Sequence, residues 1–488
     1  MAETKPGAQG APVSPLRPVP AGAGPEAEQA LFEVRRKIYP RAVHGWFAGW
    51  RWALVWITQV IFYGLAWLPW NDRQAVLFDL AARKFYIFGI VFWPQDFIYL
   101  TLLLVTCAIS LFLFTAVAGR LWCGYACPQT VYTEIFLWIE RRIEGDRGAR
   151  TKLDAGPLTA RKFGLKFAKH SAWVALAFWT GFTFVGYFTP IRELGAEVLG
   201  LATGPWETFW ICFYGFATYG NAGWMREQVC KYMCPYARFQ GAMFDRDTLV
   251  IAYDRSRGEP RGARGKKADP AALGLGACVD CEICVQVCPT GIDIRNGLQY
   301  ECIGCAACID GCDQVMDKMG YPRGLIRYST ENALEGHLDV GGIVKRFVRP
   351  RTLVYIALLT TVVVAGVTAL MLRVPLKVDV IRDRGAIVRE VENGEFENVY
   401  RLQVMNATEV PRRYRITVDG LQGLYVASDA LVEMPAAGTR AFPIRLRVPP
   451  GSVAGGSQKI WFNVTAEDGS GIHVREKAAF LSPKKEQN

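Results

Sequence analysis

Long apolar windows alternate with short charged segments over most of the chain. Five windows are nearly free of charge, and each is about long enough for a helix that crosses a hydrocarbon core of about 30 Å; they are Trp52–Trp70, Phe97–Ala118, Ser171–Phe188, Trp206–Ala222 and Thr352–Leu372. The second and fifth contain no charged side chain, whereas the fourth has Glu207 near its start. The pattern predicts a five-helix transmembrane region, and the alternative for each window, above all the fourth, is a buried core helix.

The distribution of Lys and Arg orients these helices. The segment Arg120–Lys169 contains ten Lys and Arg residues, whereas the short loop Thr189–Pro205 contains only Arg192. Positively charged loops are retained on the cytoplasmic side of a membrane. We therefore expect the N-terminus and Met225–Arg351 to be cytoplasmic and Arg373–Asn488 to lie outside.

Past Leu372 the pattern changes to short segments with period-2 alternation, separated by Gly, Pro and Asp. The strands expected from it are Phe396–Met405, Arg412–Val418, Leu424–Ala427, Ala441–Val448, Lys459–Ala466 and Gly471–Phe480. About 110 residues of this kind are typical of an immunoglobulin-like sandwich. We predict an all-β domain of this architecture over residues 378–485, without the cysteines of antibody domains.

Composition sets the remaining boundaries of this multi-domain chain. Residues 1–31 are rich in Ala, Gly and Pro and are predicted to be disordered. A four-span membrane domain is expected over 32–254, and a basic Gly/Pro linker at 255–273 is interpreted as a solvated tether. A cysteine-rich domain at 274–340 and the fifth span at 352–372 follow.

The kinds of side chain present limit the chemistry. The 488 residues carry a net charge of +11 but include only four His, so a metal site must be built mainly from sulfur. All 14 Cys fall between Cys107 and Cys312. The positive charge follows the membrane flanks, which indicates topology and attraction to lipid headgroups rather than nucleic-acid binding. Cys107 and Cys212 lie inside apolar windows without a partner, and we expect them to be small buried residues.

Eight cysteines form two similar runs. The first reads Cys278-x2-Cys281-x2-Cys284-x3-Cys288-Pro289, and the second is Cys302-x2-Cys305-x2-Cys308-x3-Cys312. This is the bacterial ferredoxin pattern twice over, and it predicts a cytoplasmic dicluster ferredoxin (α+β) domain with two [4Fe–4S] clusters. Zinc is the structural alternative for four thiolates, and four disulfides are a weaker one on the reducing side of a membrane.

The resemblance to bacterial ferredoxins also implies a ligand assignment, in which the fourth Cys of each run crosses to the other cluster. One cluster would take Cys278, Cys281, Cys284 and Cys312, and the other Cys302, Cys305, Cys308 and Cys288. This chain departs from the pattern at Asp313, where a second Pro usually stands, and in the 13 residues between the two runs. These departures bear on the crossing and leave the ligation itself intact.

Four further cysteines form a repeated motif. Cys123-Gly-Tyr-Ala-Cys127-Pro and Cys230-Lys-Tyr-Met-Cys234-Pro each follow an apolar window at its expected cytoplasmic end. If the two helical hairpins pack side by side, four thiols converge. Soft thiolates bind Cu(I), zinc or iron–sulfur clusters, and thiol pairs also carry electrons as a disulfide. The alternative is that these are small residues that pack two helix ends.

In the order of these features the chain resembles the FixG/RdxA/CcoG family, the membrane-bound ferredoxin-like accessory proteins of cbb3-type cytochrome c oxidase. The resemblance rests on the paired Cys-Pro motifs between spans, the two cysteine runs, a fifth span and an exported immunoglobulin-like tail. It covers nearly all of the chain after about Phe32. It implies a bacterial inner-membrane protein that reduces Cu(II) to Cu(I) for assembly of the oxidase.

The mechanism expected from this resemblance is a one-electron relay. A cytoplasmic donor would reduce the clusters, and Cu(II) would be reduced and held as Cu(I) at a catalytic copper site of four thiols, Cys123, Cys127, Cys230 and Cys234. The expected partners are membrane lipid, copper-handling proteins and oxidase assembly proteins, and a homo-oligomer is a candidate assembly. Two alternatives stay open: quinol-linked electron transfer to a periplasmic reductase, and a non-catalytic assembly scaffold.

Overall fold

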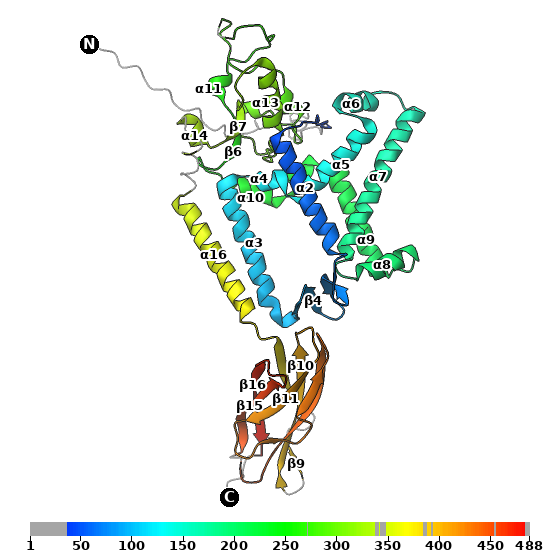
Figure 1. The fold of residues 1–488 in the computed structure, drawn as a ribbon, viewed down its shortest axis with the longest axis vertical. Helices are drawn as coiled ribbons and strands as arrows, with labels where there is room; N and C mark the ends of the chain where they lie inside the picture. Colours follow the sequence, from blue (N-terminus) through cyan, green and yellow to red (C-terminus); the bar gives the residue numbers. More distant parts are fainter. Residues whose placement is uncertain are drawn as a thin grey trace, which may run out of the picture. The chain divides into compact units, whose positions relative to one another are not determined.

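The computed structural model describes residues 37–270, 272–336, 341, 348–383, 388–391, 394–452 and 455–483. The chain divides into two compact units, Met1–Tyr39 and Pro40–Asn488. The predicted disorder of residues 1–31 falls outside the described residues, as does the predicted end of the cysteine-rich domain at residue 340. Everything that follows concerns the second unit (Figure 1).

Each of the five apolar windows forms a helix. The helices are α2 (Trp46–Leu65), α3 (Phe97–Ala118), α7 (Ala160–Val185), α9 (Pro205–Thr218) and α16 (Pro350–Met371). Two of them, α3 with the turn before it and α16, are long and apolar enough to cross a membrane. In their most apolar windows only 6% and 0% of the residues are buried. Helices that point so much apolar surface outward are not core helices, and they fit a membrane protein.

The fourth apolar window, Trp206–Ala222, differs most from a single continuous transmembrane α-helix. Helix α9 has only 14 residues and continues into a π-helix, η2 (Tyr219–Met225). A 14-residue α-helix is about 21 Å long, which is shorter than a hydrocarbon core of about 30 Å. Cys107 and Cys212, expected to be buried, are exposed on α3 and α9. That prediction was wrong because both helices are covered by other helices on one side only.

The loops between the helices are more ordered than expected. Between α2 and α3 lie a hairpin, β1 (Pro69–Trp70) and β2 (Arg73–Gln74), and an antiparallel three-stranded sheet, β3 (Val76–Asp79), β4 (Lys84–Ile87) and β5 (Ile90–Phe92). Strands of two to four residues are too short to show a period-2 pattern in the sequence. A short helix, α8 (Ile191–Leu199), fills the loop between α7 and α9.

The helices pack in two groups. Helix α16 lies along α3 (Figure 1), where the Tyr99 hydroxyl donates to the Ala369 carbonyl at 3.0 Å. Helix α7 packs against α9, and Gly181 allows the close approach because a Cβ there would collide with the Ile211 carbonyl. Helix α7 also contacts α5 (Pro128–Glu144), the helix that follows Cys127.

The cysteine-rich domain is closed by a two-stranded ribbon. Strand β6 (Val250–Tyr253) pairs antiparallel with β7 (Ile326–Ser329), so the chain enters and leaves the domain side by side. Between them lie α11 (Arg255–Gly258), α12 (Ile283–Gln286), η4 (Ile294–Asn296) and α13 (Ala307–Met319), and α14 (Glu331–Glu335) follows β7.

The basic segment expected as a solvated tether is packed against this domain. Arg264 donates to the carbonyls of Gly276, at 2.6 Å, and Cys278, at 3.2 Å. Arg257 donates to the Arg323 carbonyl at 2.9 Å. The guanidinium groups therefore bind main-chain carbonyls as well as solvent, a role that basic composition alone does not reveal.

The C-terminal domain is a sandwich of two antiparallel sheets. One has the order β12-β14-β10-β8, with β9 paired to β10, and the other has the order β13-β11-β15-β16. The strands are β8 (Leu376–Arg382), β9 (Arg389–Glu390), β10 (Phe396–Asn406), β11 (Arg412–Asp419), β12 (Tyr425–Val426), β13 (Leu431–Met434), β14 (Thr439–Val448), β15 (Gly456–Ala466) and β16 (His473–Ser482). All six predicted strands are present, and β8, β9 and β13 were missed. Alternate residues of both sheets meet in an apolar core around Tyr400, Tyr414, Phe462 and Phe480.

Candidate metal centre

Both Cys-Pro motifs use the same local design. Cys123 lies in α4 (Leu121–Tyr125) and Cys230 in a π-helical turn, η3 (Val229–Met233). Cys127 is the N-cap of α5 and Cys234 is the N-cap of α10 (Pro235–Met243), each with Pro at the first helical position. Proline is favoured there because its missing N–H would have no partner anyway. Each motif therefore places one thiol in a helical turn and the second at the start of the next helix.

The four thiols of these motifs, here called the thiol tetrad, lie near enough to act on one another's charge, although among the described residues no three of them are gathered closely enough for a single metal ion. Each is partly buried. Burial raises the pKa of Cys123 to about 11 and that of Cys230 to about 12, and the neighbouring tetrad thiols add to both shifts. The Cys123 thiol donates to Gln240 Oε1 at 3.4 Å. Cys123 and Cys230 are thus protonated at neutral pH without a metal, and metal binding would release their protons.

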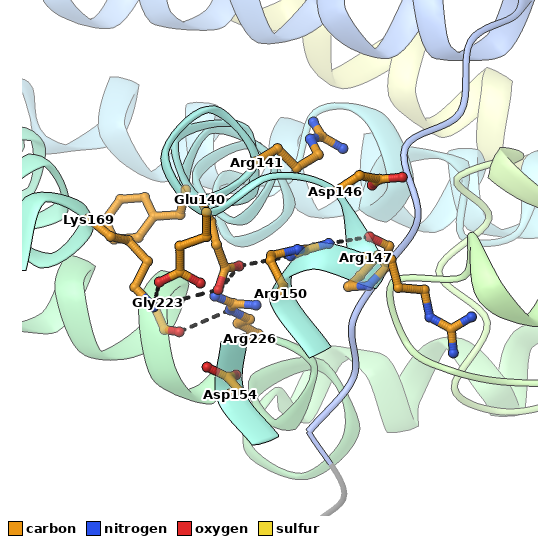
Figure 2. A network of polar contacts seen from close by, with 12 residues as sticks. Glu140, Arg141, Asp146, Arg147, Arg150, Asp154, Lys169, Gly223 and Arg226 are labelled. Atoms are coloured by element: carbon orange, nitrogen blue, oxygen red, sulfur yellow. Dashed lines mark hydrogen bonds and ion pairs between the residues drawn. The ribbon is translucent and has the colours of Figure 1, made fainter. Parts of the chain in front are cut away.

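Polar contacts between α5 and the turn before Cys230 hold the two motifs together. Gln129 Nε2 donates to the carbonyls of Asn221, at 3.0 Å, and Arg226, at 3.2 Å. Glu140 accepts from Arg226 and from Arg150, both at 3.0 Å (Figure 2). Glu140 and Arg150 are 1% exposed and Arg226 is 8% exposed. A buried charge network of this kind fixes the positions of its side chains, because moving one partner away leaves an uncompensated buried charge.

The eight remaining cysteines line two cavities. One cavity is lined by Cys278, Cys281, Cys284 and Cys312 and is called the distal site. The other is lined by Cys288, Cys302, Cys305 and Cys308 and is called the proximal site; Cys284 reaches its edge. The grouping follows the crossed assignment implied by the resemblance to ferredoxins. In the part of the chain that the structure describes, no three His, Cys, Asp or Glu side chains are gathered closely enough for a single metal ion.

The backbone of the two runs is shaped alike. Asp280 and Glu282 have positive φ angles of 51° and 54°, and the equivalent positions Gly304 and Ala306 have 69° and 58°. A positive φ costs a non-glycine residue about 1 kcal/mol or more. Both cysteine runs thus form the same unusual loop, and each site has four thiols. This arrangement fits a bound group larger than a single metal ion. These eight residues would hold two [4Fe–4S] clusters, each within a cavity of its own.

The tetrad and the proximal site touch each other. A Cβ at Gly124 would lie 2.7 Å from Cα of Cys305, and one at Gly304 would lie 3.1 Å from the Arg120 carbonyl. Cys123 and Cys230 pack against the buried group that contains Cys305. Cys230 and Cys305 also line one cavity. Glycine at position 124 therefore brings a membrane-domain thiol pair against a cluster loop.

Three family models match the chain in the same order as these features. A 4Fe-4S binding domain matches residues 100–145, a 4Fe-4S dicluster domain matches 225–331, and an IG-like fold at the C-terminus of FixG matches 366–483. The dicluster match spans all eight cysteines of the proximal and distal sites. Fold and site together define an iron–sulfur electron-transfer protein that carries an immunoglobulin-like domain.

The relatives give the family. The chain is 41% identical over 422 residues to the nitrogen fixation protein FixG of Rhizobium meliloti, covering 80% of each chain. It is 39% identical over 438 residues to protein RdxA of Cereibacter sphaeroides, covering 87% of this chain and 92% of that one. The chain belongs to the FixG/RdxA family.

Two more distant matches cover parts of the chain. The ferredoxin-type protein NapH of Haemophilus influenzae is 22% identical, over 54% of this chain and 80% of its own length. A crystal structure of a FixG-related protein from Vibrio parahaemolyticus is 25% identical and covers 23% of this chain and 97% of that one, with a TM-score of 0.21.

The structure brings the predicted cysteines into three groups, but the residues that shape those groups were missed. Gly124, Gln129, Glu140 and Arg226 carry no recognisable motif. A signal was present for Gly124 alone, because it lies within the repeated Cys-Pro motif where the second copy has Lys231.

Proposed function

We propose that this protein reduces Cu(II) to Cu(I) at the thiol tetrad, with electrons supplied through the distal and proximal sites. One observation carries the proposal: Gly124, between the thiols of the first pair, lies against the main chain of Cys305. The clusters, when bound, supply one-electron carriers. The chain's part is to hold donor and acceptor sites in van der Waals contact, so that electrons need not cross solvent.

The tetrad suits copper as a substrate because of its donor atoms. Soft thiolates prefer Cu(I) to Cu(II), so ligation favours the reduced product. The thiols are partly buried, and burial raises the pKa of Cys123 and Cys230. Copper binding must therefore displace protons, and the affinity for copper should rise with pH. Each Cu(II) takes up one electron, which a low-potential cytoplasmic donor such as a reduced flavoprotein or ferredoxin gives up.

The proposal includes an orientation in the bacterial inner membrane. All five apolar helices would span, with the tetrad and both cluster sites on the cytoplasmic side and the sandwich in the periplasm. The Lys and Arg residues between α4 and the middle of α7 support this orientation. The Cu(I) product would pass to copper-handling proteins that supply a cbb3-type oxidase.

The test replaces tetrad thiols in the full chain purified without oxygen. Cys123→Ser with Cys127→Ser should abolish Cu(II) reduction, read with a Cu(I)-specific chelator, and leave the iron content at about eight per chain. Cys107→Ser with Cys212→Ser is the matched control, because both thiols are exposed on helices outside the tetrad. Reduction at the wild-type rate in the tetrad variant would refute the site.

A second candidate is favoured by one comparison. The 4Fe-4S binding family model spans residues 100–145, which include Cys123 and Cys127. In that case the tetrad would hold a third cluster, and the protein would pass electrons onward without reducing copper. Iron analysis separates the two: about twelve irons per wild-type chain, falling to about eight in the tetrad variant, would establish the third cluster.

A further inference from the structure

A buried cation near the proximal site makes no direct ion pair with the described part of the protein. Arg51, on α2, is 9% exposed, and its Nε is buried without a hydrogen-bond partner. Among the residues that the structure describes, it makes no hydrogen bond or ion pair. A largely buried guanidinium without a directly paired carboxylate favours an anion beside it.

The cavity that Arg51 lines shows where that anion lies. The same cavity is lined by Cys305 of the proximal site and Cys230 of the tetrad. Two carboxylates lie near Arg51, but both have other partners: Glu134, which lines this cavity, pairs with Arg141 at 3.3 Å, and Asp310 accepts from the main-chain N–H groups of Phe47 and Ala48. A [4Fe–4S] cluster with four thiolate ligands carries a net negative charge, and reduction adds one more. Arg51 is placed to compensate both.

A second cation reaches the proximal site from the other side. Arg120 is 6% exposed and donates to the main-chain carbonyls of Tyr300, at 2.5 Å, and Ala237. Its own main chain touches Gly304, between two proximal cysteines. Carbonyl oxygens orient the guanidinium of Arg120, but they are neutral and do not compensate its positive charge. Two buried positive charges therefore face the proximal site.

The distal site has the opposite balance. Arg295 lies in its wall, but it is paired with Asp280 at 2.5 Å and Asp293 at 2.7 Å. Glu282 lines the same cavity. Arg264 reaches the Cys278 carbonyl from a partly exposed position, where water screens its charge. Charge on the protein thus stabilises an added electron less at the distal site than at the proximal one.

We propose that Arg51, supported by Arg120, raises the reduction potential of the proximal site above that of the distal site and so directs electrons toward the tetrad. One electron from a reduced flavoprotein or ferredoxin-type donor enters at the distal site, where Cys281 is exposed. It moves to the proximal site, where the positive charge favours it, and reduces one Cu(II) to Cu(I). The inference rests on the proposed relay and adds its direction.

The test is a redox titration of the full chain, purified without oxygen and copper, followed by electron paramagnetic resonance. Arg51→Gln should lower the potential of one cluster by about 59 mV, a tenfold change in a one-electron equilibrium, and leave the other unchanged. Arg51→Lys should retain most of the wild-type value. Cys281→Ser alters the distal signal and so identifies which cluster responds. Arg142→Gln, an exposed residue stacked on Trp138, is the matched control.

Glu134→Gln provides an independent reading if Arg51→Gln fails to assemble. Removing the carboxylate from the same cavity should raise the potential of the proximal cluster. Unchanged potentials in Arg51→Gln with full iron content would overturn the inference, as would a shift confined to the distal cluster or a fall in Glu134→Gln. Copper is not part of the titration. A normal Arg51 effect in a protein that does not reduce copper would therefore overturn the copper proposal alone.

Discussion

The C-terminal sandwich and the region around the tetrad are stabilised in different ways. In the sandwich, aromatic and aliphatic side chains fill the core, and ion pairs such as Arg413–Glu433, 65% and 70% exposed, lie at the surface. Around the tetrad the charges are inside: Glu140, Arg150 and Lys169 are each 3% exposed or less.

The difference reflects what each region must do. An apolar core is non-directional and tolerates small adjustments, so it suits a domain whose task is to keep its shape. If the tetrad thiols share a metal, as proposed, they must be fixed in direction as well as position, and hydrogen-bonded ion pairs provide that direction. Substitutions of like chemistry should therefore have unequal effects in the two regions.

The largest difference is expected for matched carboxylates. Glu140→Gln would leave Arg150 and Arg226 buried beside a neutral side chain, and we expect a loss of about 3–5 kcal/mol in stability. Glu433→Gln removes the exposed pair in the sandwich and should cost about 0–1 kcal/mol. Thermal unfolding of the full chain in detergent measures both. Equal effects of the two substitutions would contradict the comparison.

A smaller but more local effect is expected at Gly124. The added methyl of Gly124→Ala would lie 2.7 Å from the Cys305 main chain, so the tetrad and the proximal site must move apart. A displacement of about 1 Å can cost about 100-fold in rate, and copper reduction should fall by that order. Gly164→Ala on α7, where a Cβ meets nothing within 4 Å, should leave the rate unchanged. A wild-type rate in Gly124→Ala would show that the contact is not needed.

The sequence was informative where a residue's chemistry is tied to its spacing. The twelve cysteines of the two runs and the two Cys-Pro motifs are recognised from their spacing alone. The alternating strands of the sandwich were predicted from β10 to β16, except for the short β13. Apolar composition also located helices α2, α3, α7, α9 and α16, but only α3 and α16 are long and apolar enough to cross a membrane. Spacing within one segment is visible because it depends on local geometry alone.

Contacts between distant segments were not visible in this way. Arg51 and Cys305 are far apart along the chain, and nothing in either segment indicates that they share a cavity. Glu140 resembles any charged residue on an amphipathic helix until Arg226 is placed beside it. The sheet of β3, β4 and β5 was missed because its strands are shorter than the pattern used to detect them.

The smallest effect in this comparison is expected where α10 meets the start of α16. Asp245 pairs with Arg349 at 2.5 Å and Arg351 at 3.1 Å, at a partly exposed position. Burial alone would raise the pKa of Asp245, but the hydrogen bond from Arg349 and its charge outweigh that and hold it below its ordinary value of 3.8. The pKa of Asp245 is therefore lower in the folded protein than in the unfolded chain. The ion pair contributes fully to stability at pH values above the unfolded-state pKa, and this contribution is lost as the pH falls through the folded-state pKa.

Asp245→Asn should therefore cost about 0–1 kcal/mol at pH 7, far less than Glu140→Gln. The difference between wild type and variant should shrink as the pH is lowered below about 4, since wild-type Asp245 is then protonated as well. High salt should reduce the difference at pH 7, because a partly exposed pair is screened. A salt-independent loss of stability as large as that of Glu140→Gln would contradict this expectation. It would show that the Asp245 ion pair behaves like the buried network around Glu140, and the region stabilised by buried charges would then include the start of α16.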